Sequence, residues 1–461
     1  MTKKVKILTF LNLFFIILAA YAVYVFCHSN STFSADKLIS GSLLKEKHFS
    51  AEVVEIKTPD AIEAWLMEEH SAPLISISFY FDGAGYEFDE NGKVGVSNMV
   101  ANLLSYGTKE YDYEKYYDLL ETNGINISFN SNDETFGISM TTPKQNMDTA
   151  KELLKSVLTE PAFKEDDIKL VKAQVLEAIK IQAESPQKVL SQALKKEFYG
   201  DHPKARLGLG KSEDVTSLSR YDLMAFKDKH FGKNNLHIAV AGDISKQETI
   251  EILNYIFGPL KETVIIETSA SVNPAYVFDE KNIERSMPQV ISCFLAPGTK
   301  RLSPDFYSLY IANEIFGGVG LLSRLNTIAR EKEGLTYGAW TYLDSQKEAP
   351  HLIGTFSTSK QNYEQMRQIL FDEWQRMSEE GVTLAEFEAV KQNMLTSFNL
   401  RFKSISDIAL MLSYMQKENL GIDFLQKRNT YVENISFEEV NAAAKKYFKN
   451  NPSVLTIGNN D

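Results

Sequence analysis

The stretch Met140-Thr-Thr-Pro-Lys-Gln-Asn146 decides the fold, because it recurs in the second half of the chain as Phe356-Ser-Thr-Ser-Lys-Gln-Asn362. A helical pattern follows each copy, with Leu153-Leu154 after the first and Ile369-Leu370 after the second. The two copies therefore look like the same junction between elements, used twice.

A second pair of segments agrees at nearly the same spacing. His230-Phe-Gly-Lys-Asn-Asn235 leads into the strand-like run 236–242, and Tyr447-Phe-Lys-Asn-Asn451 leads into the run 454–458. Two matches about half a chain apart indicate a duplicated domain rather than a short solenoid repeat.

Each half reads as strands followed by amphipathic helices. The opening strands are predicted at 75–81 and 289–295, the next helices at 94–105 and 308–316, and the long charged helices at 166–183 and 383–402. This order predicts an α+β fold with two homologous domains, each a mostly antiparallel sheet covered by helices, facing each other across a cleft.

The domain boundaries follow from the same pattern. We expect an N-terminal domain at 50–257, a linker at 258–287 and a C-terminal domain at 288–461, because the linker stretch has no sustained helical period and contains the turn signal Asn273-Pro274. Residues 1–35 are predicted to be a cytoplasmic tip with a membrane anchor or a signal sequence.

Composition excludes some classes of function. The formal net charge of -12 works against a surface that follows nucleic-acid phosphates, so no nucleic-acid partner is expected. The two cysteines, Cys27 and Cys293, are too few and too far apart for a disulfide framework or a thiolate zinc cluster.

The amino terminus predicts a link to a membrane. Lys3, Lys4 and Lys6 precede an apolar run at 7–26, which at about 1.5 Å per residue can cross a bilayer. Positive flanks stay in the cytoplasm, so the bulk of the chain is expected to be exported, either anchored to the inner membrane or periplasmic. The alternative is a cleaved signal peptide, for which Phe33-Ser-Ala35 is a mediocre cleavage site.

The helix predicted at 94–105 precedes Gly107-Thr108. A helix shortly before a Gly-Thr resembles the arrangement in the insulinase and pitrilysin (inverzincin) family of zinc peptidases. Members of that family carry His-x-x-Glu-His on this helix. The resemblance places Asn98, Ala101 and Asn102 on the three motif positions. Asparagine is a poor zinc ligand and alanine cannot accept a proton, so the metal site is expected to be lost.

The third ligand of the family is a glutamate on a later helix, and the resemblance places it at Ala178. Its neighbour Glu177 should point to a different face of the helix. An alignment shifted by one residue would place Glu177 at the ligand position, but it would not restore the two histidines. The seven histidines contain no pair at i, i+3 or i, i+4 spacing. We therefore expect no bound metal, no other cofactor and no catalytic residue.

The second half resembles the same family at a glycine-rich loop and an Arg-x-x-x-Gly-Leu-x-Tyr signature. Gly317, Gly318 and Gly320 stand in the loop, and Arg330 and Tyr337 stand in the signature. The resemblance implies that these five residues contact substrate, since a guanidinium and a phenol can donate to a peptide carbonyl. No Gly-Lys-Ser/Thr follows the glycines, so a nucleotide loop is not favoured.

Members of this family often work in pairs, in which one subunit holds zinc and the other supplies the glycine loop. The resemblance therefore implies a non-catalytic subunit that binds peptide and completes the chamber of a zinc-bearing partner. Three alternatives stay open: a scaffold protein, a metal-independent module that captures extended peptides on a sheet edge, and a peptidase that uses other residues.

Overall fold

The protein is described here by a computed structural model, which covers residues 52–318 and 320–458. The amino-terminal apolar run and Cys27 lie outside these residues. Within the described ranges, no helix is both long and apolar enough to cross a bilayer.

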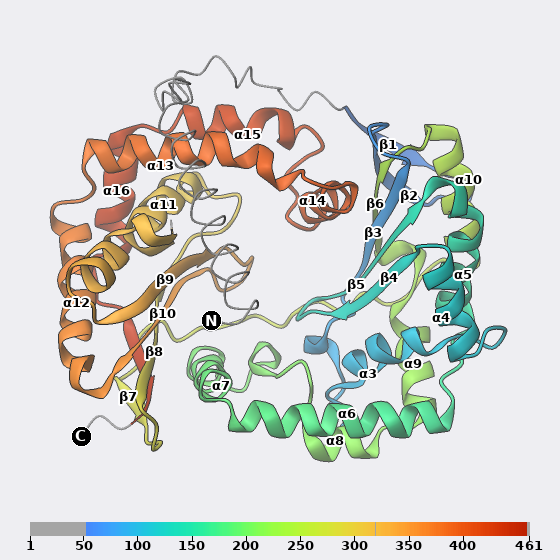
Figure 1. The fold of residues 1–461 in the computed structure, drawn as a ribbon, viewed down its shortest axis with the longest axis horizontal. Coiled ribbons are helices and arrows are strands. Elements are labelled where there is room, and N and C mark those ends of the chain that lie inside the picture. Colours follow the sequence, from blue (N-terminus) through green and yellow to red (C-terminus); the bar gives the residue numbers. More distant parts are fainter. Residues whose placement is uncertain (1–51, 319, 459–461) are drawn as a thin grey trace, which may run out of the picture. The chain divides into compact units, whose positions relative to one another are not determined.

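The first sheet has six strands in the order β1-β2-β6-β3-β5-β4 (Figure 1). Their bounds are Val53–Lys57 (β1), Glu63–Glu68 (β2), Leu74–Asp82 (β3), Asn126–Ser131 (β4), Thr135–Pro143 (β5) and Leu236–Gly242 (β6). All neighbours pair antiparallel except β2 and β6, which are parallel.

The second sheet has five strands in the order β7-β11-β8-β10-β9. Their bounds are Lys281–Ile283 (β7), Gln289–Pro297 (β8), Thr336–Asp344 (β9), His351–Ser359 (β10) and Ser453–Ile457 (β11). Here too a single pair, β7 with β11, is parallel. The strand order β6-β3-β5-β4 of the first sheet thus matches β11-β8-β10-β9 of the second.

The repeated sequence segments fall at equivalent places. The first copy ends β5 and forms a 3-10 turn at Lys144–Asn146 before α5 (Met147–Thr159). The second copy ends β10 and forms a 3-10 turn at Lys360–Asn362 before α12 (Tyr363–Glu379). The segments at 230–235 and 447–451 likewise precede β6 and β11. The predicted α+β fold with mostly antiparallel sheets is confirmed.

Helices surround both sheets (Figure 1). In the first half they are α3 (Val96–Leu103), α4 (Tyr113–Thr122), α6 (Glu165–Glu184), α7 (Pro186–Tyr199), α8 (Ser212–Ser217), α9 (Arg220–His230) and α10 (Lys246–Phe257). In the second half they are α11 (Phe306–Asn313), α13 (Leu384–Ser397), α14 (Ile405–Lys417), α15 (Phe424–Glu433) and α16 (Phe437–Tyr447).

Local sequence explains where several helices begin. Ser245 caps α10 and Thr383 caps α13, each in a capping box that satisfies free amide groups of the first turn. The helix predicted at 383–402 ends earlier, at Ser397, and a 3-10 turn follows at Phe398–Arg401. Further along, Ser404 takes an extended conformation and caps α14.

Two helices cross between the halves. α7 of the first half packs against β8 and β11 of the second sheet, where Leu190, Leu194 and Phe198 join Leu295 and Leu455 in one buried cluster. α14 of the second half packs against β3 and β6 of the first sheet. Each sheet thus has one face covered by a helix from the other half, which ties the two halves together.

Candidate functional site

Helix α3 contains Asn98, Ala101 and Asn102, the residues that the resemblance predicts at the zinc-motif positions. Its buried face includes Met99, Val100 and Leu103, which join the core of the first half. The side-chain amide of Asn102 donates to the Asn98 carbonyl at 2.8 Å and to Asn98 Oδ1 at 3.2 Å. The two asparagines therefore lie on one helix face, as two ligands at i and i+4 would, but they bond to each other.

Helix α6 packs against α3 and carries the third position. Ala178 is half-buried and lies three residues after the buried Val175, on the same side of the helix. Glu177 is exposed and receives an ion pair from Lys180 at 3.4 Å. Its carboxylate is thus turned to solvent, which places it on a different face from position 178.

The described part of the chain holds no group of three or more His, Cys, Asp and Glu side chains able to bind a metal ion. The histidines make contacts of other kinds. His230 is buried with Nδ1 2.9 Å from the Gly83 carbonyl, and burial lowers its pKa to about 4. His70 is exposed and pairs with Asp243 at 2.6 Å, which raises its pKa.

A buried carboxylate holds the start of α3. Asp89 accepts from the amide of Gly95 at 2.7 Å and from the amide and hydroxyl of Ser97 at 3.3 and 3.2 Å. Burial raises the pKa of Asp89 to about 7, although these hydrogen bonds act in the opposite direction. The orientation of the vacated site thus depends on a group that titrates near neutral pH.

Arg330 and Tyr337 lie on either side of the turn that enters β9. Arg330 is in the π-helical turn at Asn326–Lys332, and Tyr337 is the second residue of the strand. Tyr337 is 84% exposed, and among the described residues neither side chain has a hydrogen bond, ion pair or ring contact. Both groups are therefore free to contact another molecule.

The glycine loop leaves no room for side chains at two of its positions. A Cβ at Gly317 would stand 2.6 Å from Thr341 Oγ1, and one at Gly318 would stand 2.6 Å from Glu314 Oε1. Gly320 differs, with open space around it and a φ of +48°. Close packing against Thr341 favours glycine at 317, and the positive φ favours glycine at 320, whereas at Gly318 the close atoms belong to the movable end of the Glu314 side chain.

Two further residues hold the loop, and the sequence reasoning missed them. Asn326 donates to the carbonyls of Gly320 and Ala339 at 2.8 and 2.9 Å, which ties the loop to β9. The buried Arg324 bonds to both oxygens of Glu386 at 2.6 Å each. Burial opposes the charge of Glu386, but Arg324 holds its pKa at about 2. The signal was an arginine followed two residues later by an asparagine, both directly after the glycines.

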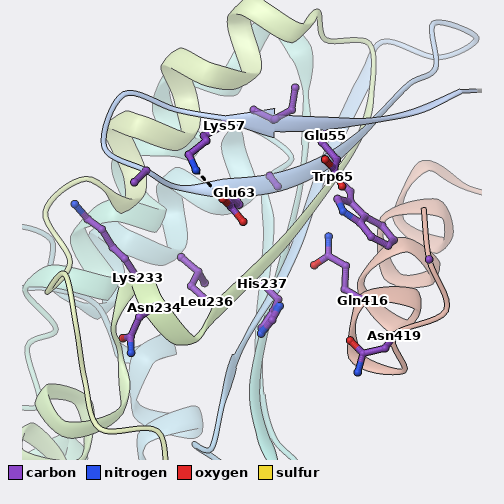
Figure 2. Close-up of a pocket in the computed structure, with 14 residues that line it drawn as sticks. Glu55, Lys57, Glu63, Trp65, Lys233, Asn234, Leu236, His237, Gln416 and Asn419 are labelled. Carbon is purple, nitrogen blue, oxygen red and sulfur yellow. Dashed lines mark hydrogen bonds and ion pairs between the residues drawn. The ribbon is translucent and has the colours of Figure 1, made fainter. Parts of the chain in front are cut away.

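A cavity of about 890 Å³ lies elsewhere, between β1, β2, β6 and the end of α14. Figure 2 shows Lys57 paired with Glu63 across the two strands, and Gln416 of α14 near Trp65. Gln416 donates to the Ile238 carbonyl at 2.8 Å. None of the site residues predicted from the sequence lines this cavity.

The predicted site therefore falls into two groups of residues. Thr341 and Asn326 join the glycine loop to the strand that carries Tyr337. No hydrogen bond or ion pair between described residues joins Arg330 or Tyr337 to α3 or α6. One group lies on α3 and α6, and the other presents a half-buried arginine and an exposed tyrosine.

Comparison with known proteins agrees with this description. Residues 66–210 match the family "Insulinase (Peptidase family M16)" and residues 217–394 match "Peptidase M16 inactive domain". A "Non-peptidase homolog YmxG" of Helicobacter pylori is 27% identical over 89% of this chain and 93% of its own length.

Solved structures share the fold. A peptidase M16 inactive domain from Pseudomonas fluorescens has a TM-score of 0.81 at 23% identity and covers 88% of this chain and 98% of its own. A protease from Helicobacter pylori has a TM-score of 0.77 at 16% identity, with 88% and 99% coverage. The chain belongs to the insulinase (M16) family, as an inactive homologue.

Proposed function

We propose that this protein is a non-catalytic subunit that binds a peptide and completes the substrate chamber of a zinc-bearing insulinase-family partner. One observation carries the proposal: Arg330 and Tyr337 are present at the signature positions, and neither is used within the described chain. Tyr337 is 84% exposed and shares β9 with two more exposed aromatic residues, and a group of exposed apolar side chains often marks a contact site.

The strand that presents Tyr337 supports a peptide ligand. β9 is an edge of the second sheet, and Asn326 already bonds to the N–H and the C=O of Ala339, so only the rest of this edge could pair with an extended chain. Trp340 and Tyr342 are also exposed along this strand. The free backbone groups would provide affinity, and the aromatic side chains would contact alternate residues of the peptide.

The vacated site favours a second candidate, a metal-independent peptide-binding module. Asn98 and Asn102 both offer donors and acceptors, which suit a peptide backbone. In that case the chain would bind peptide with no partner. A scaffold role would leave Arg330 and Tyr337 unused.

Localisation belongs to the same proposal. We expect residues 7–26 to anchor the chain or direct its export, with the bulk of the chain on the envelope side. Protease added to intact spheroplasts should then degrade the protein, while a cytoplasmic marker survives. Protection equal to that of the marker would contradict the proposed location.

The main test uses the full-length chain alone and mixed with an insulinase-family protein that carries His-x-x-Glu-His. Zinc content and cleavage of a peptide library are measured for each sample. We expect cleavage by the mixture, and a loss on the order of 100-fold when Arg330 is changed to alanine, as for removal of a donor that faces developing charge. Arg376→Ala is the matched control, because Arg376 pairs with Glu373 and Glu380 on α12.

The outcomes separate the candidates. Stoichiometric zinc or cleavage by this chain alone would overturn the proposal. Cleavage by the mixture that is equal for Arg330→Ala and Arg376→Ala would leave only a scaffold role. Saturable peptide binding without any effect on the partner's cleavage would favour the metal-independent module.

A further inference from the structure

A cavity of about 100 Å³ lies in the helical layer of the second half. Its walls come from the loop before α11 and from α11, α13, α14 and α15. A water molecule occupies about 30 Å³ of the liquid, so the cavity has room for about three waters or for one small polar group.

Three arginines line this cavity: Arg301, Arg401 and Arg428. None of them forms an ion pair with a carboxylate among the described residues. Elsewhere in the second half Arg324, Arg367 and Arg376 all have carboxylate partners. Three unpaired guanidiniums around one cavity are unusual in a chain whose formal net charge is -12.

The nearest negative charges do not neutralise the cluster. Glu314 and Glu418 interact electrostatically with Arg401 and Arg301, but neither lies within ion-pair distance of them. Burial raises the pKa of both carboxyls, which favours their uncharged forms. Within the cavity, positive charge is therefore in excess.

Arg428 is the most desolvated of the three, at 8% exposure. Its Nη1 donates to the Met394 carbonyl at 2.7 Å and to Asn429 Oδ1 at 2.9 Å. A guanidinium has five N–H donors, so these two bonds leave most of its capacity unused. Burial, with the nearby charges of Arg401 and Arg301, lowers the pKa of Arg428 to about 10.

Aromatic rings hold two of the guanidiniums in place. Arg301 lies 4.0 Å from the centre of the Phe306 ring, and Arg428 lies 4.4 Å from that of Phe398. Arg301 also donates to Tyr307 Oη at 3.5 Å. Stacking fixes the plane of a guanidinium and leaves its remaining N–H groups for a further partner. The arginines are thus oriented before any ligand arrives.

We propose that this arginine pocket binds a small oxyanion, a carboxylate or phosphate group carried by a ligand. Paired hydrogen bonds from a guanidinium match the geometry of both groups. An anion would satisfy the free donors of Arg428 and offset the repulsion among three like charges. No residue of β9, α3 or α6 lines this pocket.

The pocket also adjoins the helix that crosses to the first half. Met411 and Tyr414 of α14 line its wall, and two residues after Tyr414 the side chain of Gln416 reaches the Ile238 carbonyl of β6. An anion in the pocket would therefore stabilise α14 in its position on the first sheet. Ligand binding is expected to raise the unfolding temperature of the whole chain.

The test measures binding of inorganic phosphate and of acetate to the full-length chain, by calorimetry and by thermal unfolding at constant ionic strength. We expect saturable binding of at least one probe, and the two arms show whether phosphate or carboxylate is preferred. Arg401→Gln and Arg301→Gln should each weaken binding about tenfold or more, as expected for loss of a charge-assisted hydrogen bond. Arg376→Gln should leave it unchanged.

A second readout keeps the proposal falsifiable if a variant is less stable. Without ligand, Arg401→Gln should melt at or above the wild-type temperature, because it removes one of three like charges, and Arg401 is exposed. No saturable binding of either probe, or equal weakening by Arg376→Gln, would overturn the proposal. A lower melting temperature of Arg401→Gln with unchanged probe binding would overturn it as well.

Discussion

Helix α3 of the first half and strand β9 of the second half each have a buried face and a site face, and they differ in what the site face has kept. On α3, Met99 and Val100 are buried, while the opposite face carries Asn98 and Asn102 at the predicted motif positions. On β9, Ala339 is buried and Tyr337 remains exposed at its signature position.

This difference teaches that the fold and the chemistry depend on separate residues. The apolar side chains of α3 hold the helix against the sheet, so the site face could change without loss of the core. The first half therefore keeps a complete core, although α3 carries no metal-binding side chain at the predicted motif positions. Changes to the site face should therefore leave the buried face intact.

The metal site should be recoverable by three substitutions, Asn98→His, Asn102→His and Ala178→Glu. The hydrogen bond between the two asparagines places both on one face, and α6 packs against α3. We expect about one zinc per chain in the triple variant, as for a site with three protein ligands. Elemental analysis after dialysis measures this.

The control for this prediction is the double variant Asn98→His with Asn102→His, which keeps Glu177. Because Glu177 is turned to solvent and pairs with Lys180, it should not replace Glu at position 178. Equal zinc binding by the double and triple variants would show that the ligand face of α6 has been assigned wrongly.

The core of the second half should be far more sensitive than its site face. Trp374 is 1% exposed, contacts Phe316 and Phe448, and donates from its indole N–H to the Asn450 carbonyl at 2.9 Å. Trp374→Ala should lower the free energy of unfolding by about 3–5 kcal/mol. Denaturant unfolding measures the change.

Trp340 provides the matched comparison, because it is the same residue type but is 44% exposed on β9. Trp340→Ala should cost no more than about 0.5 kcal/mol, as is usual for a surface change. If both tryptophan variants lost similar stability, the exposed face of β9 would be part of the core and not a surface for a ligand.

The cap of α3 should make stability depend on pH. The pKa of Asp89 is raised to about 7 in the folded state, so between about pH 4 and pH 7 the folded chain binds more protons than the unfolded chain. This contribution is present at low pH and is lost as the pH rises through 7. Asp89→Asn should remove a slope of up to roughly 1.4 kcal/mol per pH unit.

Denaturant unfolding at several pH values measures that slope. Asp112→Asn is the control, since Asp112 caps α4 from an exposed position. Asparagine caps a helix about as well as aspartate, so this variant should stay close to wild type and keep the wild-type dependence of stability on pH. If the stability of the wild type and that of Asp89→Asn changed equally between pH 5 and pH 7, the role assigned to Asp89 would be wrong.

Much of the fold was predictable because its helices and strands follow from sequence patterns over a few neighbouring residues. The repeat at 140–146 and 356–362 ends a strand and begins a helix in both halves, and the strand predicted at 75–81 matches β3. That Asn98 and Asn102 share one face of α3 could be predicted, because the period of a helix fixes which residues lie on the same face. These features depend on neighbours a few residues apart.

Other features could not be predicted because they depend on distant partners. An amphipathic helix shows its apolar face but not what covers it, so the packing of α7 and α14 on opposite sheets was missed. The pair Arg324 and Glu386 joins residues 62 positions apart. The arginine pocket likewise collects Arg301, Arg401 and Arg428 from three separate segments.

The smallest predicted effect concerns the glycine loop. Gly320 has a φ of +48° and open space where a Cβ would stand, so Gly320→Ala should cost only about 1 kcal/mol of backbone strain. Gly317→Ala should cost more, because its Cβ would stand 2.6 Å from the buried Thr341 Oγ1. Thermal unfolding of the two variants measures the difference. If Gly320→Ala instead abolished activity of the paired enzyme without a loss of stability, the loop would act through a conformation that only glycine allows, and the site face would extend beyond Arg330 and Tyr337.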